Sequence, residues 1–200
     1  MHEAYEAFPI LERLPLEIES LTAYDGNLVV GTRQGHLLMY SVGETGAQAD
    51  VQLLRSNKNF SRRPINQVAV VPHHQILISL SDSLISIHDL TVYNFPLLST
   101  MNNTKGATTF DLEIMHHVSL TGETAVTVRL AVVVRRKLQL YYWKARQFQP
   151  LQNDIALTDI PRQILWCGGA VVMDQCAGYL TVQLSGAQSA VLETSRSCEM

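Results

Sequence analysis

The chain repeats one pattern of apolar and polar positions three times. Each copy is an apolar run, a short polar turn and a second apolar run that ends in large side chains. The copies span residues 28–40, 76–88 and 130–142, which are offsets of 48 and then 54 residues. Two apolar runs joined by a polar turn predict two antiparallel strands. Repetition at roughly this period is typical of β-propellers, whose blades recur every ~40–50 residues.

The residues that flank each hairpin predict the remaining strands of a blade. Candidate innermost strands lie at 18–23, 65–71 and 109–115, with a fourth at 162–166, and shorter, more polar outer strands lie at 52–54, 95–100 and 148–151. Central strands of such a blade are buried on both faces, whereas the outer strand meets water. The sequence therefore predicts an all-β fold: a partial β-propeller of antiparallel four-stranded blades, with three blades plus part of a fourth.

Length limits how much of a propeller the chain can form. Its 200 residues are 46% hydrophobic, which is enough for a sizeable core. A closed propeller of seven blades, however, needs roughly 300 residues at ~40–45 per blade. We therefore expect a fragment, an alternative product of a longer gene, or an open sector completed by association. A terminal blade without a neighbour exposes an apolar face, so we expect the isolated chain to be poorly stable.

Charge adds two small basic sites. The formal net charge is −3 and the charges form no long block, which argues against a nucleic-acid-binding protein. One basic site is Lys58 with Arg62 and Arg63, and the other is the run 135–137 at the third hairpin turn. A turn of like charge is typical of a solvated loop tip, and the alternative is contact with an acidic partner or a lipid headgroup.

Other sequence signals favour a reduced, cytosolic protein. No apolar run approaches the ~20 residues of a transmembrane helix. The first residues lack the basic and apolar regions of a secretory signal. All three cysteines, Cys167, Cys176 and Cys198, lie in the last 34 residues, and this odd, clustered count does not form a disulfide framework.

Candidate chemistry is sparse. The adjacent pairs 73–74 and 116–117 are histidines, but neighbouring side chains on a strand point to opposite faces, so neither pair chelates one ion by itself. The turn Gly31–Gly35 lacks the Lys-Ser/Thr and the following helix of a phosphate-binding loop. No set of Ser, His and Asp or of Cys and His has a supporting motif. We therefore predict no catalytic residue, no metal and no cofactor.

Five stretches of sequence carry a family resemblance. They are Pro9–Ile18 together with the hairpin 28–40, Arg55–Ser61, Lys105–Ala107, Lys137–Lys144 and Asp159–Cys167. In combination they resemble the opening of a citron-homology (CNH) domain, and more narrowly the Vam/Vps39-like subunits of the HOPS tethering complex, over residues 1–167. The TGF-β-receptor-associated subunit of the related CORVET complex shares the general domain pattern and is the alternative.

The resemblance implies an interaction protein rather than an enzyme. Members use the N-terminal propeller to recognise a membrane-bound Rab-family small GTPase in its GTP form. The rest of the subunit joins other HOPS/CORVET-type tethering subunits and promotes fusion at late endosomes and at the lysosome or vacuole. A cytoplasmic protein, held peripherally on these membranes through its partners, is thus implied. A citron-homology scaffold in small-GTPase or kinase signalling remains the second possibility, and a propeller enzyme the third.

Exposed turns are where we expect the partner to bind, because recognition residues concentrate on loops held by a rigid scaffold. Arginines suit the acidic and aromatic switch surface of a GTPase. The candidate binding residues are Arg33, Gln34, His36, Arg62, Arg63, Arg135, Arg136 and Lys137.

The last part of the chain departs from the family pattern. Residues 168–200 are expected to be a divergent tail, with a possible hairpin at 170–184. From residue 185 onward the sequence lacks strand alternation, and we expect disorder there.

Overall fold

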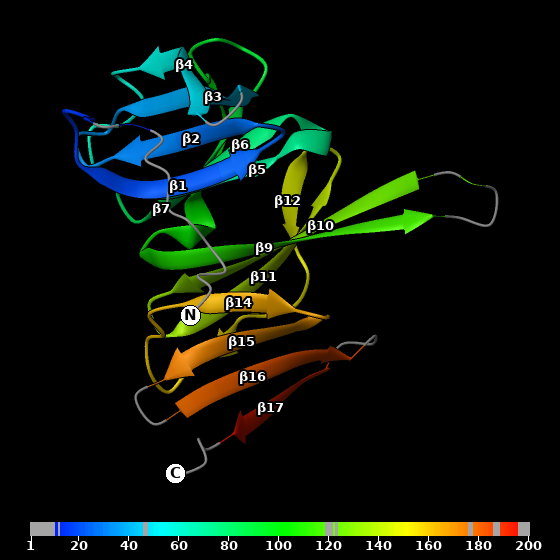
Figure 1. The fold of residues 1–200 in the computed structure, drawn as a ribbon. Coiled ribbons are helices and arrows are strands. Elements are labelled where there is room, and N and C mark those ends of the chain that lie inside the picture. Colours follow the sequence, from blue (N-terminus) through cyan, green and yellow to red (C-terminus); the bar gives the residue numbers. More distant parts are fainter. Residues whose placement is uncertain are drawn as a thin grey trace, which may run out of the picture. The chain divides into compact units, whose positions relative to one another are not determined.

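The computed structural model describes residues 11, 13–45, 48–118, 122, 124–175, 178–185 and 189–195 of the chain. The chain divides into two compact units. Unit 1 comprises Met1–Asp82 and Ser86–Leu98, and unit 2 comprises Ser83–Ile85 and Ser99–Met200. The described strands form four antiparallel sheets (Figure 1). No helix of the described residues is long and apolar enough to cross a membrane.

Two sheets come from the first half of the chain. The first contains β1 (Ile18–Tyr24), β2 (Asn27–Thr32), β3 (Leu37–Thr45) and β4 (Gln48–Asn57), in the order β1-β2-β3-β4. The second contains β5 (Ile65–Val71), β6 (Ile76–Ser81), β7 (Leu84–Asp89) and β8 (Leu97–Met101), in the order β5-β6-β7-β8. Short 3-10 turns, η1 (Pro72–His74) and η2 (Asn102–Thr104), follow β5 and β8.

Unit 2 contains the other two sheets. The third sheet has the order β12-β11-β10-β9, from β9 (Ala107–Val118), β10 (Thr124–Val134), β11 (Lys137–Lys144) and β12 (Gln147–Pro150), and β13 (Ile155–Ala156) also pairs with β11. The fourth has the order β14-β15-β16-β17, from β14 (Ile164–Cys167), β15 (Ala170–Gln175), β16 (Gly178–Ser185) and β17 (Ser189–Ser195). Strand order follows chain order in every sheet, as in a propeller blade, so the expected all-β blade architecture is confirmed.

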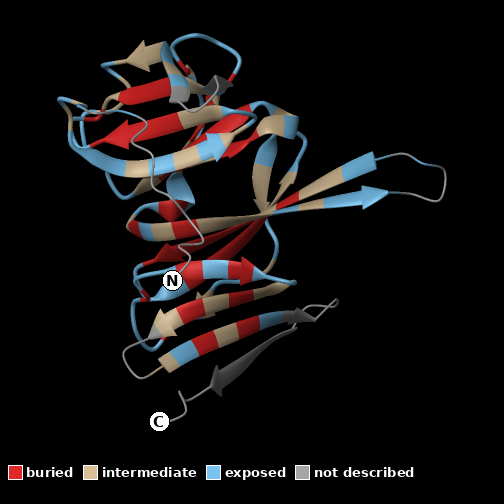
Figure 2. Ribbon diagram, viewed as in Figure 1, coloured by how far each residue is buried: buried red, intermediate tan, exposed pale blue. Residues whose placement is uncertain are grey.

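The three repeated hairpins are the centres of the first three sheets. They correspond to β2–β3, β6–β7 and β10–β11. Burial explains their continuous apolar runs, because the last five residues of β10 are all buried, as are the first five of β6. In the first three sheets the hairpin strands are more buried than the outer strands β4, β8 and β12 (Figure 2). The runs are therefore core strands.

The fourth sheet is more complete than the sequence predicts. The expected hairpin at 170–184 is β15–β16. The expectation of disorder beyond it does not hold for Ser189–Ser195, which forms β17 and pairs with β16 from Tyr179↔Ser195 to Ser185↔Ser189. The free edge of β16 supplies backbone partners to β17, and backbone pairing needs no alternation of apolar side chains. Ser185 likewise belongs to β16, and the rest of the predicted disorder, at 186–188 and 196–200, lies outside the described residues.

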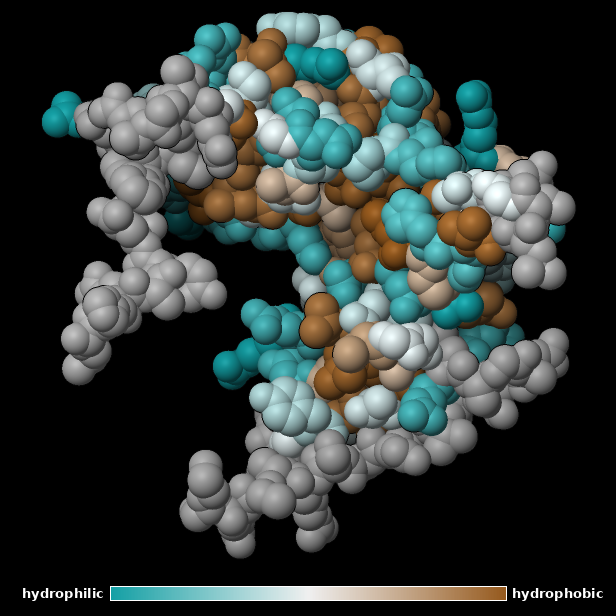
Figure 3. Space-filling view, turned by 45° about the vertical axis from the view of Figure 1, so that its right-hand side comes forward, coloured by the Kyte–Doolittle hydropathy of each residue, from teal (hydrophilic) through white to brown (hydrophobic). Residues whose placement is uncertain are grey.

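Each unit has a core between two of its sheets. In unit 1 the core cluster joins residues of β2 and β3 to residues of β5 and β6: Val29, Leu37, Met39, Ile65, Val68, Val70 and Leu77, with Leu90 and Phe95. In unit 2 it joins β10 and β11 to β14, β15 and β16: Ala131, Val133, Leu138, Leu140, Leu157, Ile164, Trp166, Val171, Met173, Leu180 and Val182. Apolar side chains also reach the surface, where brown patches lie among teal ones (Figure 3).

Candidate functional site

The turn between β2 and β3 in unit 1 carries three of the predicted binding residues. Thr32 closes the turn, because its hydroxyl donates to the His36 carbonyl at 3.0 Å and accepts from the His36 N–H at 2.9 Å. The Gly35 N–H donates to the Thr32 carbonyl at 3.1 Å. Arg33 and Gln34 are exposed at the tip, whereas His36 is half-buried. His36 is thus less available to a partner than the sequence predicts.

Gly35 allows this turn to pack closely against the segment that carries Arg62 and Arg63. The Ser61 N–H donates to the Gly35 carbonyl at 3.0 Å. Gly35 has a φ of +80°, and a Cβ at this position would overlap the Ser61 carbonyl oxygen. Only glycine therefore allows the close approach. The structure thereby joins two groups of predicted residues, which are distant in sequence, into one surface, here named the turn surface: Arg33, Gln34, Arg62 and Arg63.

Carboxylates offset part of the charge of the turn surface. The Arg33 guanidinium is 2.8 Å from the Glu17 carboxylate, and this hydrogen bond raises the pKa of Arg33. The Arg63 guanidinium is 3.9 Å from the Asp82 carboxylate. Arg62 is exposed and has no ion pair with any described residue. Negative groups therefore flank two cations of the turn surface, and Arg62 is the cation that no described carboxylate pairs.

The other three predicted residues lie in unit 2, beside a pocket of about 740 Å³. Arg135 and Arg136 form the turn between β10 and β11, and Lys137 begins β11. All three are exposed and line the pocket. Sequence reasoning missed Lys105 and Asp154, which also line it. They are far from the turn in sequence, and only the fold brings them to it. This depression is here named the basic pocket.

Polar side chains inside the basic pocket form a chain of hydrogen bonds. The Lys137 ammonium is 3.2 Å from the Asp154 carboxylate. The Gln139 amide donates to both Asp154 oxygens at 3.4 Å and 3.3 Å. The Tyr141 hydroxyl donates to the Gln139 Oε1 at 2.9 Å. Burial raises the pKa of Tyr141, so its hydroxyl stays protonated at neutral pH. Asp154 is therefore compensated by its neighbours.

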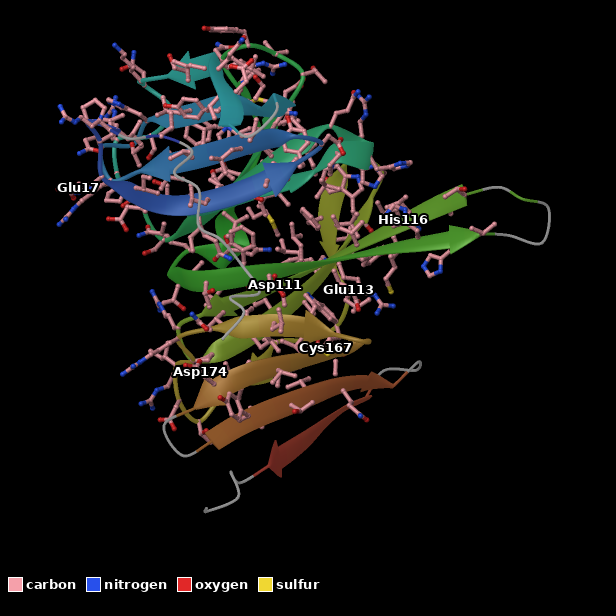
Figure 4. All side chains as sticks on the ribbon, viewed as in Figure 1. Glu17, Asp111, Glu113, His116, Cys167 and Asp174 are labelled. Carbon is pink, nitrogen blue, oxygen red and sulfur yellow. The ribbon has the colours of Figure 1, made fainter. Side chains whose placement is uncertain are left out.

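Two carboxylates on β9 have a structural role that the sequence does not reveal. Asp111 accepts from the backbone N–H of Trp166 at 2.7 Å, and Glu113 accepts from that of Gly169 at 3.1 Å. Both carboxylates lie on β9 beside β14 (Figure 4). Burial raises the pKa of Asp111, and the Trp166 hydrogen bond partly opposes that shift. Since their oxygens accept main-chain hydrogen bonds, we assign both to packing between the third and fourth sheets.

The remaining titratable groups do not assemble a reactive site. No group of three or more His, Cys, Asp or Glu side chains that could hold a metal ion occurs within the described ranges. The rings of His73 and His74 meet edge to face at 5.1 Å, in a 3-10 turn. Cys167 is an exposed free thiol, and the other two cysteines lie outside the described residues.

Comparison with known proteins assigns a family to this arrangement. The model of the CNH domain matches residues 24–186, and so extends past residue 167, where the sequence analysis ends the resemblance. The Vam6/Vps39-like protein of Homo sapiens is 39% identical over 199 residues, covering 93% of this chain and 22% of that protein. The vacuolar protein sorting-associated protein 39 homolog of Drosophila melanogaster is 35% identical over 188 residues, covering 93% of this chain and 21% of that protein. The chain thus spans about a fifth of the length of these relatives.

Solved structures resemble the chain in fold. The AfRom2 CNH domain matches with a TM-score of 0.57 and 12% identity, over 88% of this chain and 55% of that chain. Kluyveromyces lactis Hsv2 with its complete loop 6CD matches with a TM-score of 0.55 and 11% identity, over 91% of this chain and 51% of that chain. At such identities the likeness concerns the fold alone.

Proposed function

Because the chain belongs to the CNH domain family, with close relatives among Vam6/Vps39-like proteins, we propose that it is an interaction module in vesicle tethering. Its role is in transport from late endosomes to the lysosome or vacuole, as part of a HOPS-type complex. It acts by recognition, not by catalysis. It reaches the membrane from the cytoplasm through its partners.

The proposed partner is a Rab-family GTPase in its GTP form, and the proposed contact is the turn surface. The observation that carries this proposal is the close packing of the β2–β3 turn on Ser61 at Gly35, which brings Arg33 near the loop that carries Arg62 and Arg63. Charges of both signs on such a surface give an interface its orientation and partner choice more than its raw affinity. Arg62, the unpaired cation, is the residue best placed to attract an acidic switch surface.

The test is a pulldown of the 200-residue chain with a panel of Rab GTPases, each loaded with a non-hydrolysable GTP analogue or with GDP. We expect retention of one or more Rab proteins in the GTP form only. Arg62→Glu should reduce that retention and make it less sensitive to salt. The matched control is Arg146→Glu, at an exposed turn of unit 2, which should bind as the wild type does.

Two outcomes contradict the proposal. Equal retention of the GTP and GDP forms would show that the chain does not distinguish the two conformations of the GTPase switch regions. Selective retention of GTP-loaded Rho proteins would instead support a signalling scaffold of the citron-homology type.

A further inference from the structure

We propose that the basic pocket of unit 2 binds a small phosphorylated polyol, either as a soluble phosphate ester or as the headgroup of a membrane lipid. This site is separate in its chemistry from GTPase recognition at the turn surface, and the proposal does not depend on it. The pocket combines an excess of cations, a fixed shape and an acceptor for hydroxyl groups.

The lining of the pocket is strongly cationic. Four cationic side chains, Lys105, Arg135, Arg136 and Lys137, stand against one carboxylate, Asp154. Lys137 is paired with Asp154, whereas the other three cations have no ion pair with any described residue. Like charges held close together destabilise a fold slightly, so their gathering around a depression is not explained by stability. A phosphomonoester, with about two negative charges near neutral pH, would neutralise them.

Hydrogen bonds fix the rim of the pocket from two sides. The Arg135 N–H donates to the Gly106 carbonyl at 3.2 Å, and the Leu157 N–H donates to the Arg136 carbonyl at 2.9 Å. The Arg135 side chain also lies along Gly106, where a Cβ would be 3.2 Å from Arg135 Nε and 3.3 Å from its Cγ. The missing side chain of Gly106 therefore makes room for the arginine stem. A rim fixed before binding lowers the entropic cost of holding an anion.

The polar groups of the inner wall select the class of anion. Asp154 is compensated by Lys137 and Gln139, so it does not cancel the field of the other three cations. A carboxylate held in this way is a good acceptor for the hydroxyl groups of a ring or chain. A volume of about 740 Å³ lies within the range of small-molecule sites. A compact phosphate ester that also carries hydroxyls fits these features better than an extended acidic peptide, which needs a long groove.

Binding is tested on the full chain with three probes. Inositol hexakisphosphate is titrated calorimetrically as the soluble polyol phosphate. Flotation with phosphatidylcholine vesicles containing 5 mol% phosphatidylinositol 4,5-bisphosphate tests the headgroup, against vesicles containing 20 mol% phosphatidylserine as the negative arm. Polyglutamate is the competitor that represents an acidic peptide. We expect saturable binding of the phosphate probes and little response to phosphatidylserine or polyglutamate. Calorimetric binding without flotation assigns the site to soluble esters, and flotation competed by the soluble probe assigns it to lipid headgroups.

A pair of matched double variants separates the pocket from charge in general. Lys105→Gln with Arg136→Gln removes two cations of the pocket lining. Lys144→Gln with Arg146→Gln removes two cations from exposed positions of the same sheet, outside the lining residues. We expect at least a tenfold loss of phosphate affinity in the first variant and less than a twofold change in the second.

Three outcomes overturn the proposal. They are no binding of either phosphate probe by the wild type, an equal loss in both double variants, and displacement by polyglutamate as effective as by inositol hexakisphosphate. Far-ultraviolet circular dichroism and the thermal midpoint check that each variant is folded. If Lys105→Gln with Arg136→Gln does not fold, Arg136→Lys is measured instead, because it keeps the charge but loses the planar fork, and a retained affinity would then overturn a directed phosphate contact. None of these measurements contains a GTPase, so failure here leaves the Rab proposal standing, and the reverse also holds.

Discussion

The Asp111 carboxylate accepts the backbone N–H of Trp166 at 2.7 Å, across the gap between the innermost strands of two consecutive sheets. Glu113 repeats the arrangement with Gly169, two residues further along β9. In unit 1 the Ser20 hydroxyl donates to the Ile65 carbonyl at 2.7 Å, again between the first strands of consecutive sheets. Side chains of one blade therefore satisfy main-chain groups of the next.

We predict that Asp111→Ala destabilises the chain by about 1–3 kcal/mol, because it leaves the partly buried Trp166 N–H without its acceptor. Asp111→Asn should lose much less, since the amide oxygen can still accept that hydrogen bond and the cost of burying a charge disappears. Urea denaturation of both variants measures the difference. Equal destabilisation by the two substitutions would contradict this role of Asp111.

Acid should weaken unit 1 through His88. Burial lowers the pKa of His88 to about 4, and the hydrogen bond between the ring and the Phe95 carbonyl partly opposes this shift. The ring lies 3.1 Å from both the Phe95 carbonyl and the Ser79 hydroxyl and stacks on Phe60 with centroids 4.3 Å apart. Since a carbonyl only accepts, Nδ1 carries the proton and Nε2 accepts from Ser79.

The sign of this effect follows from linkage. Between the ordinary histidine pKa of about 6.5 and the folded value of about 4, the unfolded chain binds a proton that the folded chain does not. Stability therefore falls as the pH falls through this window, by about 3 kcal/mol in total. We expect His88→Gln to flatten the dependence of the urea midpoint on pH between 7 and 4.5. An unchanged slope in this variant would rule out His88 as the titrating group.

Replacing Gly35 with alanine should destabilise the chain more than the same substitution at a turn glycine that has no close neighbour. Gly35→Ala combines a strained φ with an overlap against the Ser61 carbonyl, and we expect a loss of about 2 kcal/mol or more. Gly169 is the control, because its φ is +84° but no described atom beyond its chain neighbours lies within 4 Å of an added Cβ. Gly169→Ala should lose only about 1 kcal/mol. Similar losses of stability in the two variants, measured by thermal denaturation, would show that the contact between Gly35 and Ser61 contributes little to stability.

The outer face of the fourth sheet should promote self-association. Leu165 is 61% exposed on β14 and Tyr179 is 56% exposed on β16. Apolar side chains on an uncovered sheet face are a predicted site of association. Sedimentation velocity over a range of concentrations should show less association for Leu165→Ser than for the wild type. Ile160→Ser, at a loop position that is 51% exposed, should leave association unchanged, and an equal effect of both substitutions would contradict a face-specific contact.

Periodicity made the blade strands predictable. The pattern of two apolar runs around a polar turn at 28–40, 76–88 and 130–142 reports local structure, and β5 has the same bounds as its predicted strand. The strand β17 was missed because its partner is the edge of β16, which pattern reading does not supply.

Only part of the candidate site could be predicted from the sequence. Turn arginines are recognisable in the sequence. Tertiary contacts between segments far apart in the chain are not, and these bring Gly35 against Ser61. They also bring Lys105 and Asp154 to the β10–β11 turn. The half-burial of His36 was not visible in the sequence either.

The side-chain links between innermost strands have a consequence for how such chains change in evolution. A β-ladder has a register, and a slip of one residue turns every side chain to the wrong face. A single carboxylate that reaches a neighbouring main chain imposes no such alignment on the rest of its strand. We therefore expect a change in the length of one blade, as in the long hairpin of β9 and β10, to leave the pairing within its neighbours intact. We expect duplication and drift to act on one blade at a time, because these side-chain hydrogen bonds attach neighbouring sheets without fixing their register relative to one another.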